Sequence, residues 1–103
     1  MASTMDAIGT VRDQLVPLVD RLVEQLEAEA DSGSALWFRQ VRDSLVGARS
    51  EEDLIMIFIE QLGPTGPMAN AADFTILARY HLDALLAKAQ EVAFTFSAGG
   101  DAH

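Results

Sequence analysis

The residue best suited to chemistry in this chain is His81, because an imidazole can hold or release a proton near neutral pH. It lies within the apolar stripe of a predicted last helix, between Tyr80 and Leu82. Asp83 follows two residues later. If His81 carried a phosphoryl group, a cation nearby would stabilise it, and an acid would not. We expect His81 to be a core or interface histidine that is hydrogen-bonded through one ring nitrogen.

Phosphotransfer is the alternative role for His81. Histidine phosphotransfer modules are acidic four-helix domains of this size, in which a lysine and a small residue follow a solvent-exposed histidine. The segment here, Tyr80-His81-Leu82-Asp83-Ala84-Leu85, lacks that lysine and does not match the family. A histidine phosphotransfer-like or other small enzymatic bundle using His81 is therefore the second hypothesis for this chain.

Other catalytic arrangements are missing from the sequence. The chain has no cysteine, which excludes disulfides, thiolate nucleophiles and cysteine-based metal sites. No acid stands one helical turn from His81, and no Glu-x-x-His pair could build a metal site in a bundle. The acids at 51–53 point about 100° apart on a helix and are typical of a helix N-terminus. No Gly-x-Ser-x-Gly elbow or phosphate-binding loop occurs. We expect no catalytic residue, metal or cofactor.

Composition narrows the function further. The 103 residues suffice for one domain, and 16 acidic against 7 basic residues give a net charge of −9. This charge repels nucleic acid and anionic membrane surfaces, so neither is an expected partner. The longest strongly apolar run, residues 54–59, is far shorter than the roughly 20 residues of a membrane span. The N-terminus has no secretory signal pattern, so the expected location is cytoplasmic.

Apolar periodicity predicts an all-α, compact, four-helix bundle-like single domain over residues 1–103. A helix from Thr4 to Ala30 has a broad apolar stripe that keeps its phase across Pro17, which predicts one helix with a kink there. Its acidic end should be frayed or paired with a basic neighbour. A second helix is expected over 35–48, with Ser34 as its N-cap.

Two further helices complete the prediction. Ser50 and the acids after it predict a helix of about 12 residues, although 54–59 could also form a buried strand. Residues 63–67 predict a rigid, exposed loop. Asn70 or Gly66 can cap the last helix, and Asn70 is the better candidate because Asp73 follows three residues later. This helix should end near Phe94, and residues 97–103 should be a disordered tail.

The candidate interface consists of apolar side chains outside the main buried face of their helix, together with an aromatic–basic cluster. On the third helix, a wheel at about 100° per residue places Leu54, Ile55, Phe58, Ile59 and Leu62 on the buried arc. The side chains outside the main faces are Met56 and Ile57 on the third helix and Ile76, Tyr80 and Phe94 on the fourth. The cluster is Trp37 and Phe38 with Arg39 and Arg42. In its alternative role, both aromatic side chains belong to the core and the arginines bridge to the acidic first helix.

Half of the residues are hydrophobic, which is plentiful for a small chain, and surplus apolar surface in small chains often forms a subunit interface. The sequence therefore predicts a non-catalytic protein-interaction module that is a homodimer. Adaptor, inhibitor, immunity or small regulatory proteins are the roles that fit this description, with another protein as partner.

Overall fold

Every regular element within residues 4–100 is a helix. The computed structural model describes the backbone of residues 4–100 and the side chains of residues 8–65, 67, 68 and 72–93. Its elements are α1 (Thr4–Ala28), α2 (Ser32–Gly47), α3 (Glu51–Met56), η1 (Ile57–Leu62), α4 (Thr65–Ala72) and α5 (Ile76–Gly100). Residues 4–100 contain no strand, which confirms the all-α prediction.

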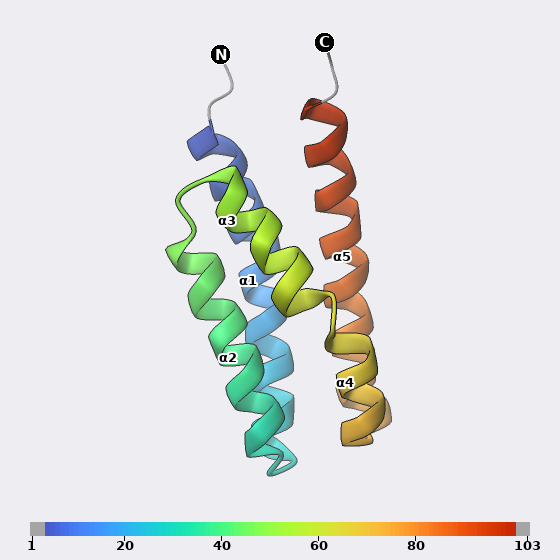
Figure 1. Cartoon of the computed structure of the whole chain (residues 1–103). Helices are drawn as coiled ribbons and strands as arrows, with labels where there is room; N and C mark the ends of the chain where they lie inside the picture. Colours follow the sequence, from blue (N-terminus) through green and yellow to red (C-terminus); the bar gives the residue numbers. More distant parts are fainter. Residues whose placement is uncertain (1–3, 101–103) are drawn as a thin grey trace.

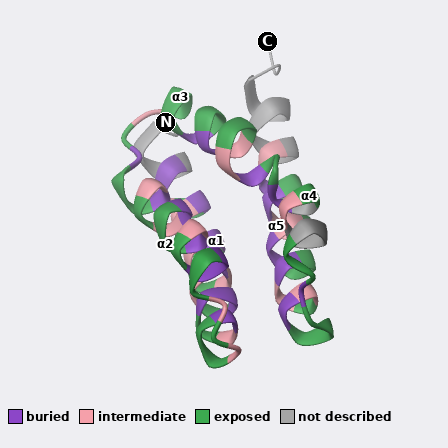
Figure 2. Cartoon of the chain, turned by 60° about the horizontal axis from the view of Figure 1, so that its bottom comes forward, coloured by how far each residue is buried: buried purple, intermediate pink, exposed green. Residues whose placement is uncertain are grey.

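The long helix α1 organises the molecule. It packs against α2 on one side and α5 on the other, and α3 with η1 lies across the bundle near the chain ends (Figure 1). The described chain measures 46 × 20 × 18 Å, an elongated bundle with a length close to that of its two 25-residue helices. In Figure 2, buried residues recur at intervals along α1, α2 and α5, as expected for helices that each bury one stripe.

The apolar stripe of α1 forms the largest part of the core, as the sequence predicts. The helix runs unbroken through Pro17, which is exposed, and the kink there stays a prediction. The buried side chains of α1 are Ile8, Val11, Leu15, Val19, Leu22, Val23 and Leu26. They meet Phe38, Val41 and Leu45 of α2 and Ala78, Leu82, Leu85, Ala89 and Val92 of α5 in one continuous cluster.

The end of α1 is a left-handed turn. Ala30 has φ = 62°, the Ala30 N–H donates to Glu27 O at 3.0 Å, and the Asp31 N–H donates to Leu26 O at 2.9 Å. These two bonds form a Schellman motif, which places Asp31 directly before α2. Asp31 is therefore the N-cap, with its side chain accepting from the Ser34 N–H at 3.2 Å. The prediction that Ser34 is the cap is wrong, because α2 begins at Ser32.

The third predicted helix is present as α3 followed by the π-helical η1, so the alternative of a strand is wrong. The Ser50 hydroxyl accepts from the Asp53 N–H at 3.2 Å, and the Asp53 carboxylate accepts from the Arg49 N–H at 2.9 Å. The Ser50 bond is an N-cap and confirms the predicted helix start.

The buried face of this helix differs from the predicted one. Ile57 is buried, with 5% of its surface exposed, whereas Ile55 and Ile59 are exposed. In η1 the backbone hydrogen bonds join residues five apart, as from the Gly63 N–H to Phe58 O at 2.9 Å. Residues five apart therefore stack, and Ile57 and Leu62 share the buried face. With Leu54 at 0°, a step of about 100° per residue places the buried Ile57 and Leu62 at about −60° and 80°, so the observed buried face is the predicted arc turned by about 60°.

The predicted loop at 63–67 is mostly helical. Pro67 lies in the first turn of α4, where a missing backbone N–H costs no intrahelical bond. The buried Thr65 hydroxyl donates to Leu62 O at 2.6 Å and fixes the turn between η1 and α4. Asn70 lies inside α4, so its predicted capping role is wrong. Thr75 caps α5 instead, accepting from the Ala78 N–H at 3.1 Å.

The last helix is longer than predicted. It extends to Gly100, so residues 97–100 belong to α5, and residues 101–103 lie outside the described part of the chain. Adding one residue to a helix that already exists gains a backbone hydrogen bond without a new nucleus, which explains the extension through small residues.

Candidate functional site

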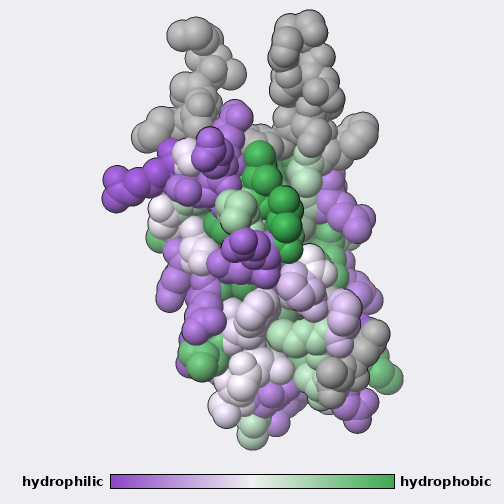
Figure 3. All heavy atoms as spheres, in the orientation of Figure 1, coloured by the Kyte–Doolittle hydropathy of each residue, from purple (hydrophilic) through white to green (hydrophobic). Residues whose placement is uncertain are grey.

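The exposed side of the α3–η1 helix carries three large apolar side chains. Ile55, Met56 and Ile59 occupy adjacent positions on it, and Ile59 has 65% of its surface exposed. We call these three residues the α3–η1 patch. Figure 3 shows strongly hydrophobic residues gathered over this helix, with hydrophilic residues beside them. Met56 is exposed, as predicted for a side chain outside the main buried face. Ile57 is buried, so it does not belong to the candidate interface.

A second group of exposed apolar side chains lies at the start of α5. Ile76, Leu77 and Tyr80 share the spacing of the first patch, and Ile76 is 90% exposed. We call these residues the α5 patch. Leu77 belongs to this group because 58% of its surface is exposed, whereas the next residue, Ala78, is buried. Figure 1 places this turn beside α4, at the end of the molecule away from α3.

The sequence places the apolar side chains of both helices in one candidate interface, but the two patches lie apart. The α3–η1 patch lies on the half of the molecule that holds the chain ends, and the α5 patch lies on the other half (Figure 1). The side chain of Phe94, the remaining candidate from the last helix, lies outside the described residues.

The aromatic–basic cluster of α2 is engaged within the molecule. Trp37 is half-buried and packs against the core. Arg39 forms an ion pair with Glu27, and the Arg42 Nε donates to Asp20 Oδ1 at 2.6 Å. The arginines thus bridge α2 to the acidic face of α1, which is the alternative role predicted for them. Both partners of each pair are more than a third exposed, so each pair stabilises the fold by at most about 1 kcal/mol.

His81 contacts its neighbour on α5. Its ring meets that of Tyr80 edge to face, with ring centroids 5.5 Å apart and planes at 72°. His81 is half-buried, and its role as a core or interface histidine stays a prediction. Among the described residues, no three histidine, cysteine, aspartate or glutamate side chains converge in a way that could hold a metal ion.

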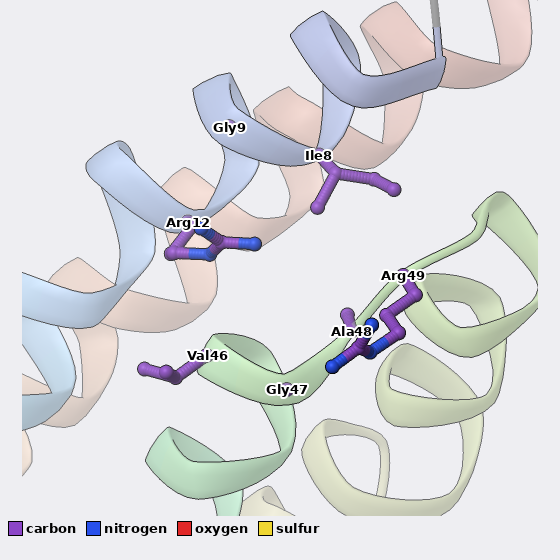
Figure 4. Close-up of a pocket in the computed structure, with 7 residues that line it drawn as sticks. All are labelled: Ile8, Gly9, Arg12, Val46, Gly47, Ala48 and Arg49. Carbon is purple, nitrogen blue, oxygen red and sulfur yellow. The ribbon is translucent and has the colours of Figure 1, made fainter.

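Sequence reasoning missed a pocket of about 330 Å³ beside the N-terminal half of α1. It lies where α2 ends and the chain turns towards α3 (Figure 4). The side chains that line it are Ile8, Arg12, Val46, Ala48 and Arg49. The two arginines stand 37 positions apart in the sequence, and no local pattern indicates that the fold brings them together.

No helix in the described part of the chain is long and apolar enough to cross a membrane. Comparison of the sequence with protein-family models and curated proteins, and of the structure with solved structures, found no match.

Proposed function

We propose that this chain is a non-catalytic protein-interaction module that forms a homodimer through the α3–η1 patch. The observation that carries the proposal is the exposure of Ile55, Met56 and Ile59 on one continuous helical segment. Burying one large aliphatic side chain is favourable by about 1.5–3 kcal/mol, so three adjacent ones offer a substantial driving force for association. The proposal includes a role as an adaptor, inhibitor, immunity or regulatory protein.

The dimensions of the molecule support a second copy as the partner. A standard interface buries about 800 Å² on each partner. A face of 46 × 20 Å is large enough to supply that area. A two-fold axis through the patch would also let each subunit cover the apolar side chains of the other.

The local structure makes the patch a persistent feature. Leu54, Ile57 and Leu62 are buried and hold the segment against the core. The N-cap at Ser50 and the Thr65 bond to Leu62 fix its two ends. Ile55 and Ile59 therefore cannot turn inward without removing buried residues from the core.

Ile59→Glu tests the proposal. We expect the unmodified protein to have twice its chain mass of 11.1 kDa at tens of micromolar, measured by light scattering after size-exclusion chromatography. A charge buried in the interface should make Ile59→Glu monomeric with unchanged helical circular dichroism. Ile76→Glu is the matched control, because Ile76 is even more exposed and lies in the other patch.

These outcomes test the homodimer and the choice of its surface separately. A monomer for the unmodified protein at these concentrations would overturn the homodimer. Dissociation by Ile76→Glu but not by Ile59→Glu would keep the homodimer and contradict the choice of the α3–η1 patch.

A further inference from the structure

The pocket beside α1 gathers positive charge in a chain of net charge −9. Arg12 reaches it from α1, and Arg49 reaches it from the connection between α2 and α3 (Figure 4). Ile8, Val46 and Ala48 supply apolar walls. The pocket thus combines two guanidinium groups with a small apolar surface.

These two arginines differ from those that join α2 to α1. Arg39 and Arg42 have acidic partners on α1, whereas the ion pairs among the described side chains do not include Arg12 or Arg49. The Arg12 Nε is buried and has no hydrogen-bond partner among the described residues. A buried donor without an acceptor is costly, so the Arg12 guanidinium has hydrogen-bonding capacity that the described part of the molecule does not use.

We propose that this pocket binds a carboxylate that carries a short aliphatic group. A guanidinium donates two parallel hydrogen bonds to a carboxylate, and a second guanidinium across the pocket strengthens the attraction. The apolar walls accommodate the aliphatic part of the ligand. A phosphate would be bound by the same donors, but it has no aliphatic part to occupy the apolar walls of the pocket.

The carboxylate could belong to a small acid or to the C-terminus of a peptide, and the experiment distinguishes the two. The probes are butyrate, butyramide, inorganic phosphate, and a tripeptide ending in alanine with either a free or an amidated C-terminus. Binding is followed by amide chemical shifts of the full chain in ¹⁵N-labelled protein at low salt. We expect shifts in residues 8–12 and 46–49 that saturate with butyrate or with the free peptide, whichever is the natural source.

Substitutions in the pocket provide the decisive comparison. Arg12→Gln and Arg49→Gln should each weaken binding by about tenfold, since a hydrogen bond to a charged group commonly contributes this much. Arg12→Lys keeps the charge but removes the paired donors, so it should also weaken binding. Arg21→Gln, an exposed position farther along α1, is the matched control and should bind as the unmodified protein does.

Binding of butyramide equal to that of butyrate, or tighter binding of phosphate, would overturn the carboxylate assignment. Absence of saturable shifts with every carboxylate probe, or equal weakening by Arg21→Gln, would overturn the site itself. Arg49 is exposed, so Arg49→Gln keeps the test informative if Arg12→Gln disturbs folding.

Discussion

Leu45 and Leu36 provide a direct measure of what core packing contributes in this molecule. Both lie on α2, but Leu45 is fully buried and Leu36 is 54% exposed. Leu45→Ala should lower the free energy of unfolding by about 2–5 kcal/mol, because it removes buried methyl groups and leaves a cavity. Leu36→Ala should change it by less than about 0.5 kcal/mol. Urea denaturation followed by circular dichroism would show the difference, and equal losses would contradict the packing of α2.

Single residues also show where sequence reasoning succeeds. The Ser50 cap could be predicted because a hydroxyl, three acids and an apolar run follow one another without an alternative. Asp31 and Ser34 both suit an N-cap, and local sequence cannot choose between them. The choice depends on where α1 ends, and that is set by the left-handed Ala30.

At the scale of helix ends, the left-handed conformation of Ala30 predicts that glycine at this position stabilises the protein. Its φ of 62° is unfavourable for a residue with a Cβ by about 1–2 kcal/mol, whereas glycine adopts it freely. Ala30→Gly should therefore raise the free energy of unfolding by about 0.5 kcal/mol, after the greater entropy of an unfolded glycine is subtracted. Ala28→Gly, the last residue of α1, should lower it by up to about 1 kcal/mol. Thermal unfolding of the two variants should shift in opposite directions, and a shared direction would contradict the turn.

The π-helical turn makes a second prediction about an element. A Cβ added at Gly63 would lie 2.8 Å from the carbonyl oxygen of Ile59, which belongs to the backbone of η1 and cannot move aside freely. Gly63→Ala should destabilise the protein by about 1–3 kcal/mol. Gly33→Ala has open space around the new methyl group and lies in α2, so it should stabilise by about 0.5–1 kcal/mol. Stabilisation by Gly63→Ala would mean that η1 is an ordinary α-helix in solution.

A helix with one distinct apolar side could be predicted, whereas a helix that is apolar on most sides could not. The stripe of α1 follows about 100° per residue over its whole length, so its buried face was predicted correctly. Apolar side chains surround most of the α3–η1 helix, so its sequence allows more than one buried arc, and the structure buries Ile57 and exposes Ile59. α4 was missed because prolines were treated as helix breakers, although Pro67 lies in a first turn. The pocket was missed because only tertiary packing brings Arg12 and Arg49 together.

At the scale of the whole molecule, net charge opposes the proposed homodimer. Each subunit carries −9, and Glu51, Glu52 and Glu60 lie exposed on the same helical segment as the α3–η1 patch. Apolar burial must exceed this repulsion for two copies to associate. By contrast, a partner with a basic surface would be attracted to the same acids.

Salt therefore distinguishes the two kinds of partner. Charges are screened over about 8 Å at 0.15 M and over about 30 Å at 0.01 M. Salt weakens the repulsion between like subunits. The dissociation constant of the homodimer should therefore be at least about threefold lower at 0.15 M sodium chloride than at 0.01 M. Sedimentation velocity over a concentration series measures this constant at each salt. The doubly substituted Glu51→Gln, Glu52→Gln protein should dimerise more tightly at low salt and respond less to added salt. Dimerisation that weakens as salt rises would mean that opposite charges hold the subunits together, and would contradict an interface centred on Ile55, Met56 and Ile59.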